Sequence, residues 1–355
     1  MTKLRYLGWD GYTDGSFAAA LRSATGIEIE GQLHLSDDLA CRMTQATPDL
    51  WDIININTPF VRNVLHPAGF IRTLPDKFAG EVKSLSGMFG RFIAPATSPT
   101  GDIIGIPQRC GPFNLVINQK RLSIDIARER GFGLTLEPDF HKRFGILEYE
   151  DFNVMHIAIA ADLNPFGSFD EAAASTFAQA VRTIFASARI ISTDHNHLNR
   201  ALINGDIDFY ISGGIYTASP ARLAGRLEVR AVTPDNGPIE GKGGVAFVEI
   251  NSLLQHNKNS FDAEEAYLDY LGSDTGAVEA SLAANACNPV VQMQRKSVLD
   301  RFSRQQLKAM QWEDFEEDLS RCAEYSIIPD YERLSAILRT ASTTEVNRHR
   351  GGQRV

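Results

Sequence analysis

The sequence predicts an α/β protein built around a parallel sheet. Residues 4–65 alternate apolar stretches of strand length with stretches of helical period, and glycine or capping residues separate them. This β-α-β-α-β order is typical of parallel sheets, which bind ligands beyond the carboxyl ends of their strands.

Local signals place the elements of this first segment. Gly26 follows the first helical stretch, where a left-handed C-cap favours glycine, and Ser36 precedes the second, where its hydroxyl can cap the helix. We therefore expect strands at 4–8, 27–33 and 51–56, and helices at 16–24, 36–44 and 59–65.

A second alternating segment begins after Asn118. Its longest helical stretch, 170–188, puts Phe177, Val181 and Ile184 on one stripe, which predicts a separate core. We expect further strands at 207–211, 229–232 and 245–250, and helices at 199–203, 263–271, 276–284 and 304–319.

Residues 105–118 hold a polar cluster with Arg109 and Cys110 between two apolar stretches, which we interpret as two strands. Such a cluster is typical of a cleft floor. The fork of an arginine suits a carboxylate, and a buried arginine without an anionic partner is costly. Two interpretations stay open: Arg109 holds an anionic group of a ligand, or it turns away and pairs with a nearby Asp or Glu.

Composition narrows the function classes. The chain has 355 residues, of which 43% are hydrophobic and 22% charged, as is ordinary for a soluble protein of two or three domains. Its net charge of -9 and the lack of a basic run argue against nucleic acid or an anionic membrane as partner. The start of the chain lacks the pattern of a signal peptide, so we expect that segment to be absent or already removed.

Neither cysteine nor histidine spacing indicates a metal site. Cys41, Cys110, Cys287 and Cys322 are far apart, and we expect buried free thiols. His195 and His197 form an H-x-H without a third ligand at a supporting spacing, so we interpret this segment as a polar turn before a helix. No cofactor and no metal are expected.

Several short motifs occur in a recognisable order, namely Trp9-Asp-Gly-Tyr12, Ala24-Thr-Gly-Ile27, Trp51-Asp-Ile-Ile54, Gly105-Ile-Pro107, Gly205-Asp206, Thr233-Pro234 and Asn288-Pro289. Together they span roughly residues 4–340, and this order resembles that of the spermidine/putrescine-binding proteins of bacterial ABC importers. The resemblance implies a bilobal type II periplasmic binding protein fold, in which two α/β lobes joined by crossing hinge strands close over a ligand. It also implies a periplasmic monomer that serves an ABC permease.

The resemblance further implies a division of the chain. Lobe one would contain residues 1–111 plus 243–293, and lobe two residues 112–242 plus 294–342. We expect residues 343–355 to form a disordered tail. The hinge would lie near 113–118 and 233–244.

Candidate ligand-binding residues follow from the family's aromatic box and acidic contacts. Trp9, Asp10 and Tyr12 match aromatic and acidic or hydroxyl positions, and Asp151 matches the first of two acids. The second acid falls near Val154, and the family's tryptophans at Ser212-Gly213 and near Glu240 are lost. The full candidate set is Trp9, Asp10, Tyr12, Asn57, Thr58, Arg109, Cys110, Asp151, Tyr210, Ser212, Gly213, Tyr216 and Glu240.

Two groups of these candidates carry open alternatives. Asn57 and Thr58 either bond a ligand or cap the helix after Pro59. Tyr210, Ser212 and Tyr216 flank the loop after a strand, where they would donate to a carboxylate or hydroxyl.

The residues predict a small polar ligand with an amine and, through Arg109, a carboxylate: an ω-amino acid, an amino-acid conjugate or a polyamine-like molecule. An alternative is a transferase that resembles thiaminase I, with Cys110 as nucleophile and a pKa lowered by Arg109. Residues 208–216 lack the glutamate base that such an enzyme needs, so we expect no enzymatic activity.

Overall fold

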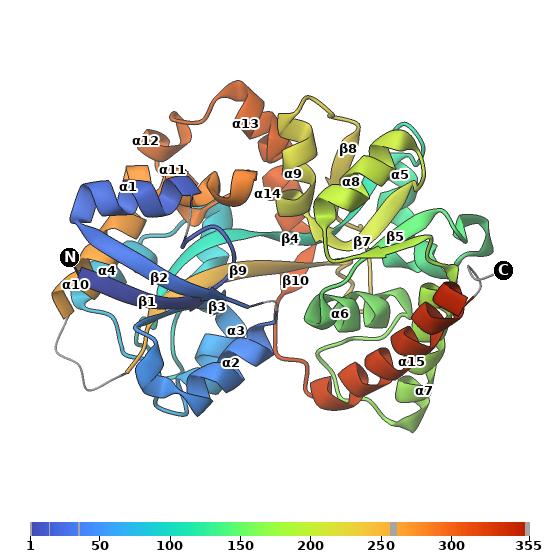
Figure 1. Cartoon of the computed structure of the whole chain (residues 1–355), viewed down its shortest axis with the longest axis horizontal. Coiled ribbons are helices and arrows are strands. Elements are labelled where there is room, and N and C mark those ends of the chain that lie inside the picture. The colour runs from blue at the N-terminus through green and yellow to red at the C-terminus, as the bar shows by residue number, and fades with distance from the viewer. Residues whose placement is uncertain (1, 14, 35, 256–260, 352–355) are drawn as a thin grey trace. The chain divides into compact units, whose positions relative to one another are not determined.

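The computed structural model describes residues 2–13, 15–34, 36–255 and 261–351. The chain forms two compact α/β units, each built from two stretches of sequence (Figure 1). Unit 1 contains Met1–Gly111 and Phe247–Glu316, and unit 2 contains Pro112–Ala246 and Glu317–Val355. Strands β4 (Ile106–Asn118) and β9 (Gly244–Leu253) each have residues in both units.

The sheet of unit 1 has the expected parallel start. Its strand order is β2 (Ile27–Leu33), β1 (Thr2–Gly8), β3 (Ile53–Asn57), β9 and β4. Strand β1 pairs in parallel with both of its neighbours, whereas β9 runs antiparallel to β3. The β-α-β-α-β prediction is therefore confirmed.

Helices cover both faces of this sheet (Figure 1). Helices α1 (Gly15–Thr25), α10 (Phe261–Gly272) and α11 (Asp274–Ser281) pack together on one side, and α2 (Asp37–Ala46) lies on the other with α3 (Thr58–Phe60). Ser36 caps α2 as expected. The remaining elements of unit 1 are η1 (Pro48–Leu50), η2 (Val61–Leu65), α4 (Asp76–Lys83), η3 (Gly87–Phe92), η6 (Ala283–Asn285), η7 (Val291–Gln294), α12 (Lys296–Leu299), α13 (Arg304–Ala309) and η8 (Trp312–Asp314).

The strands of unit 2 lie in the order β4, β7 (Phe209–Gly214), β5 (Phe144–Leu147) and β6 (Ile190–Ser192). Strand β8 (Val229–Val232) also pairs with β4, and β10 (Cys322–Glu324) pairs with the first residues of β9.

Two helical layers enclose these strands (Figure 1). Helices α6 (Glu150–Ala160), α7 (Glu171–Ser187) and α15 (Tyr331–Gly351) pack on each other, and the stripe of Phe177, Val181 and Ile184 is fully buried, as predicted. Helices α8 (His195–Asn204) and α9 (Ile215–Leu223) form the other layer. The other elements of this unit are α5 (Ile124–Arg130), η4 (Gly131–Leu136), η5 (Pro138–Phe140) and α14 (Phe315–Ser320), which begins in unit 1.

Some elements differ from the expectation. Residues 106–118 form one continuous strand rather than two, because the residues of the polar cluster stay extended and are part of the same strand. The helix expected at 304–319 is interrupted at Gln311, whose φ of 54° lies in the left-handed region. Residues 294–316 belong to unit 1 here, and the backbone stays helical from 343 to Gly351.

Two sequence interpretations can be read directly from the structure. Asp194 caps helix α8 by accepting from the Asn196 backbone N–H at 2.8 Å, so the H-x-H segment is a polar helix start. All four cysteines are buried free thiols. Within the described part of the chain, no three His, Cys, Asp or Glu residues are grouped to hold a metal, and no helix is both long and apolar enough to cross a bilayer.

Candidate ligand-binding site

In unit 1 the site is organised around a buried ion pair. Arg109 lies on β4, and its Nε donates to Glu249 Oε2 on β9 at 2.9 Å, with the same oxygen 2.8 Å from the terminal NH2 nitrogen. The other terminal nitrogen donates to the Asp10 carbonyl at 2.8 Å. The guanidinium also lies over the Tyr12 ring, 4.4 Å from its centroid, so cation–π attraction adds to the pairing.

This geometry decides between the two interpretations of Arg109. The guanidinium already has an internal carboxylate, a carbonyl and an aromatic face, which satisfy a buried arginine. The burial of Arg109 therefore does not require a ligand carboxylate, and the contacts favour the second interpretation, in which Arg109 pairs with a nearby acidic residue. Burial opposes the charge of Arg109, but the Glu249 carboxylate raises its pKa above the ordinary value.

Glu249 is a site residue that the sequence analysis missed. It is 8% exposed, and burial raises the pKa of its carboxyl although Arg109 acts in the opposite direction. The Tyr12 hydroxyl lies 3.5 Å from the same oxygen. The signal was present: a single glutamate in the otherwise apolar stretch 245–250 needs a partner.

Trp9 and Asp10 follow β1 directly, at the carboxyl end of that strand. The Trp9 ring is half-buried and packs on His34, with ring centroids 4.5 Å apart, whereas the Asp10 side chain is exposed. Because Arg109 and Glu249 offset each other, Asp10 gives this group of residues a net negative charge. An exposed carboxylate and an aromatic ring on consecutive residues are the residue types that bind a cationic group.

His34 supports the Trp9 ring and is neutral at pH 7. Its Nε2 lies 3.0 Å from the Asn55 carbonyl, and burial lowers its pKa from 6.5 to about 4. As pH falls from 6.5 to 4, the unfolded chain binds a proton that the folded chain excludes, so stability is present above this window and is lost within it.

We predict that His34 makes the unfolding free energy fall by about 1.4 kcal/mol per pH unit across this window. Urea unfolding of the wild type and of His34→Gln, compared between pH 6.5 and pH 4, measures it. The variant should show the shallower slope, and equal slopes would contradict the prediction.

Asn57 and Thr58 are buried at the end of β3. Asn57 donates through its backbone N–H and through Nδ2 to the Asp37 carboxylate, at 3.1 Å and 2.7 Å. Its side chain makes no capping hydrogen bond to α3. The asparagine therefore ties β3 to α2, a role that differs from both expected ones.

Cys110 lies on β4 and is only 1% exposed. Its backbone N–H donates to the Pro289 carbonyl at 3.0 Å. Burial raises the pKa of the thiol well above its ordinary value, and Glu249 raises it further. The expected lowering of this pKa by Arg109 was wrong, since Arg109 is neutralised by Glu249. A protonated, enclosed thiol is a poor nucleophile.

In unit 2, Asp151 lies in the first turn of α6 and is buried. The Tyr331 hydroxyl of α15 donates to Asp151 and lies 3.0 Å from Glu150 Oε1. Burial and then the Asp151 charge raise the pKa of Tyr331 above its ordinary value. Sequence reasoning found the acid but missed this partner, which is 180 residues away.

The side chains of Ser212 and Tyr210 are buried inside unit 2. The Tyr210 hydroxyl bonds Asn199 at 3.1 Å and Thr217 at 2.9 Å. Ser212 has a φ of 66°, and its hydroxyl donates to Asn153 Oδ1 at 2.5 Å while His156 Nδ1 lies 3.1 Å away. Backbone strain of this kind is often kept at functional sites.

Three further candidates lie near the end of strand β7, at the start of α9 and in a turn. Tyr216 is half-buried and donates to the Ser212 carbonyl at 3.3 Å. Gly213 has no room for a side chain, since a Cβ there would be 2.6 Å from the Tyr210 ring. Glu240 is exposed in the turn before β9, with a φ of 53°.

The chain has the type II periplasmic binding protein fold, as comparison with solved structures shows. The spermidine/putrescine ABC transporter substrate-binding protein PotD from Streptococcus pneumoniae matches with a TM-score of 0.67 and 12% identity, covering 96% of this chain and 100% of that one. The TpPotD lipoprotein of Treponema pallidum gives the same TM-score and identity, with 96% and 99% covered. The binding protein AgtB from A. tumefaciens R10, in complex with agropinic acid, has a TM-score of 0.62 and 12% identity, with 97% and 99% covered.

The bilobal fold class expected from the sequence is thus confirmed, and the resemblance to polyamine-type binding proteins holds at the level of structure. No family model and no curated protein matches the sequence. Since the similar structures include a protein named for spermidine and putrescine and one solved in complex with agropinic acid, the fold alone leaves the ligand open.

Proposed function

We propose that this chain is the substrate-binding protein of an ABC importer and that it captures a small polar metabolite bearing an amine. The fold supports the general role, since the similar structures are binding proteins of this kind. The amine is argued from the internal pairing of Arg109 with Glu249, which leaves the exposed carboxylate of Asp10, the residue after Trp9, as the acidic group without an internal cation in this part of unit 1 among the contacts described. Amines are common to ω-amino acids, amino-acid conjugates and polyamines.

In this proposal each residue has a stated role. Asp10 pairs with the ammonium group, and Trp9 contacts the adjacent methylenes and the cation. Arg109, Glu249 and Tyr12 hold the loop after β1 in place through the Asp10 carbonyl. On unit 2, Asp151 remains a separate acidic candidate, with the Tyr331 hydroxyl as its hydrogen-bond partner.

In this proposal, ligand binding drives transport by shifting the balance between the open and the closed state of the protein. A ligand that contacts both lobes favours their closed arrangement, because only differential affinity for two states can shift their balance. The closed form would be recognised by permease subunits, and the proposal includes a periplasmic location and a monomeric state. Capture and delivery of a ligand in this way form no covalent bond and need no cofactor.

A thermal-shift panel tests the proposal. The panel contains putrescine, spermidine, γ-aminobutyrate, an amino-acid–sugar conjugate, thiamine and the amine-free dicarboxylate succinate. A ligand that binds only the folded state raises Tm by mass action. We expect at least one amine to raise Tm and succinate to leave it unchanged. Stabilisation by succinate alone, or by none of the amines, would overturn the proposal.

A further inference from the structure

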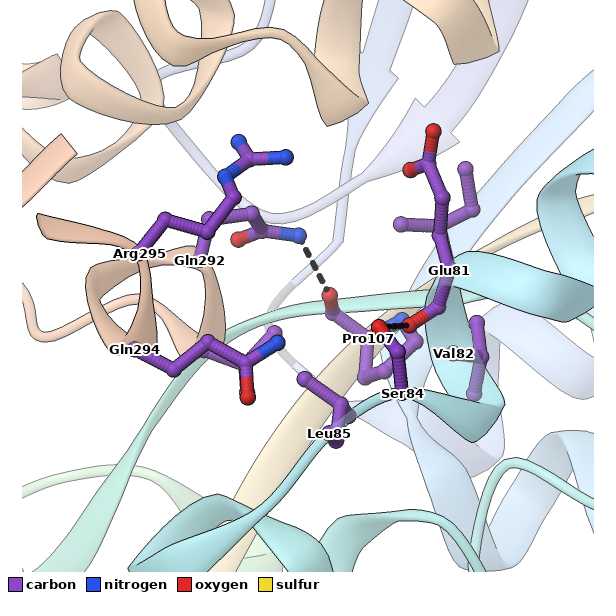
Figure 2. Close-up of a pocket in the computed structure, with 10 residues that line it drawn as sticks. Glu81, Val82, Ser84, Leu85, Pro107, Gln292, Gln294 and Arg295 are labelled. Atoms are coloured by element: carbon purple, nitrogen blue, oxygen red, sulfur yellow. Dashed lines mark hydrogen bonds between the residues drawn. The ribbon is translucent and has the colours of Figure 1, made fainter. Parts of the chain in front are cut away.

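Unit 1 has a small pocket between α4, the start of β4 and η7 (Figure 2). Its volume is about 100 Å³, whereas pockets for small-molecule ligands enclose about 300–1,000 Å³. One of its polar lining groups, the Gln292 amide, donates to the Pro107 carbonyl at 3.1 Å (Figure 2). A pocket of this size gives no reason to expect a second metabolite site, and the feature that points to a further partner lies on the surface of unit 2.

The strands of unit 2 bring several loops together at one end of their sheet. Strand β7 pairs with β4 through Phe209 and Ile117, and with β5 through Phe209 and Phe144. Strand β8 pairs with β4 through Val229 and Asn118. The loops that precede β5, β7 and β8 therefore meet the loop that follows β4. This end is opposite to the carboxyl ends of β5 and β7, where α/β sheets bind ligands.

Exposed basic side chains gather at this end of the sheet. The segments that meet there are 119–121, 139–143, 206–208 and 226–228, together with Arg189. Arg189 belongs to them because its backbone N–H donates to the Phe144 carbonyl at 2.9 Å. Their exposed acidic side chains are Asp139 and Asp206. Their exposed Lys and Arg side chains, which we call the basic end, are Lys120, Arg121, Lys142, Arg143, Arg189 and Arg226.

Two arginines of the basic end share one buried carboxylate. Asp208 accepts from Arg121 Nε at 2.5 Å and from Arg143 Nε at 2.6 Å, through different oxygens. The Asp208 side chain is 1% exposed, whereas the two arginines are 47% and 45% exposed. One carboxylate neutralises only one of two guanidinium groups, so a surplus positive charge faces solvent. Because both Nε atoms are held by Asp208, the guanidinium groups are in place before a partner binds.

The loop before β8 repeats this arrangement and adds an apolar side chain. Glu228 Oε1 accepts from Arg226 Nε at 2.9 Å, and Lys120 Nζ lies 3.6 Å from the same oxygen. Leu227, between these two loop residues, is 39% exposed. Its carbonyl accepts from Gln119 Nε2 at 3.2 Å, which ties this loop to the one after β4. Protein interfaces combine apolar contacts with a polar rim in this way.

We propose that the basic end is a docking surface for an acidic segment of another protein, and that Leu227 contacts an apolar side chain of that segment. Complementary charge speeds such an encounter and selects the partner. A nucleic acid or an anionic membrane extends over a larger area and also meets the net charge of -9 of the whole chain, whereas a short protein segment contacts this end alone. The proposal goes beyond capture of the amine, because this surface contains none of the candidate ligand-binding residues.

The test is a titration of the full-length protein with a fluorescein-labelled peptide of repeated Glu-Glu-Leu, followed by fluorescence anisotropy. The same peptide with Gln in place of every Glu is the matched probe. We expect saturable binding of the acidic peptide at low salt and at least about fivefold weaker binding at three times the Debye screening, because salt screens exposed charges. The Gln peptide should bind at least about tenfold more weakly than the acidic one.

Variants locate the binding at the basic end. Lys120→Glu should weaken the affinity for the acidic peptide at least about fivefold, since it places a like charge on the docking surface. Lys83→Glu makes the same change on an exposed lysine of unit 1 and should leave the affinity within about twofold. Leu227→Ser should weaken it about three- to tenfold, because an apolar contact is lost. Leu50→Ser, on a leucine of unit 1 that is 46% exposed, is its matched control.

Several results would overturn the proposal. These are the absence of saturable binding, equal binding of the Gln peptide, or equal losses in Lys120→Glu and Lys83→Glu. Vesicles that contain phosphatidylglycerol are titrated in parallel, and tighter binding to them than to the peptide would assign the basic end to a lipid surface instead. If Lys120→Glu does not fold, as circular dichroism shows, Leu227→Ser against Leu50→Ser decides the matter.

Discussion

Replacing Arg109 with methionine is expected to lower the free energy of unfolding by about 3–5 kcal/mol. The substitution leaves the Glu249 carboxylate buried without its partner, since the two side chains are only 7% and 11% exposed. It also removes the hydrogen bond to the Asp10 carbonyl and the contact with the Tyr12 ring. Urea unfolding followed by circular dichroism measures the loss.

A double variant separates the effect of losing the ion pair from the effect of losing the packing of the Arg109 side chain. Combining Arg109→Met with Glu249→Gln removes the stranded charge, so most of the stability should return. Glu249→Gln alone is the matched control for the second change. If Arg109→Met keeps wild-type stability and only weakens ligand binding, the arginine serves the ligand and the internal-pair assignment is wrong.

Replacing Asp10 with lysine is expected to weaken binding of the amine ligand by about a hundredfold or more. The substitution puts a like charge where the proposal places the ammonium contact, and such juxtapositions cost several kcal/mol. Stability should change by less than about 0.5 kcal/mol, because the side chain is exposed and Arg109 bonds only the backbone carbonyl of this residue. Isothermal titration with the ligand found by the thermal-shift panel measures the affinity.

Asp76→Lys provides the comparison for that experiment. It makes the same change of charge on an exposed residue of unit 1 that is not among the candidate site residues. We expect it to leave amine affinity within about twofold, since Asp76 is exposed, is not proposed to contact the ligand, and salt screens exposed charges. Equal losses in both variants would mean that net charge, rather than Asp10, attracts the ligand.

Local signals in the sequence predicted the parallel start of the fold well. Strand β2 has the expected bounds, and Ser36 caps the helix that follows it. These features depend on neighbours within a few residues, which a sequence shows directly. The continuous strand β4 was missed because Pro107, Gly111 and Pro112 look like a break, and only pairing with distant strands keeps the chain extended.

The sequence offered candidate site residues but not the long-range partners of their side chains. Trp9, Asp10 and Arg109 were identified from their places after or within strands. The partner of Arg109 is 140 residues away, and that of Asp151 is 180 residues away. No local pattern encodes such pairs, so the direction of the Arg109 side chain, and with it the chemistry expected of the ligand, stayed open until the contacts were known.

The placement of β9 between β3 and β4 has a consequence for how the chain is made. When a ribosome has released only the first 240 residues, β9 has not been made, so β3 lacks its neighbour on that side. The second stretch of unit 1, Phe247–Glu316, has not been synthesised either. An unpaired apolar edge is a template for association with other chains. Nascent protein should therefore stay dependent on chaperones until late in synthesis, and truncations that stop short of β9 should aggregate rather than give a folded first unit.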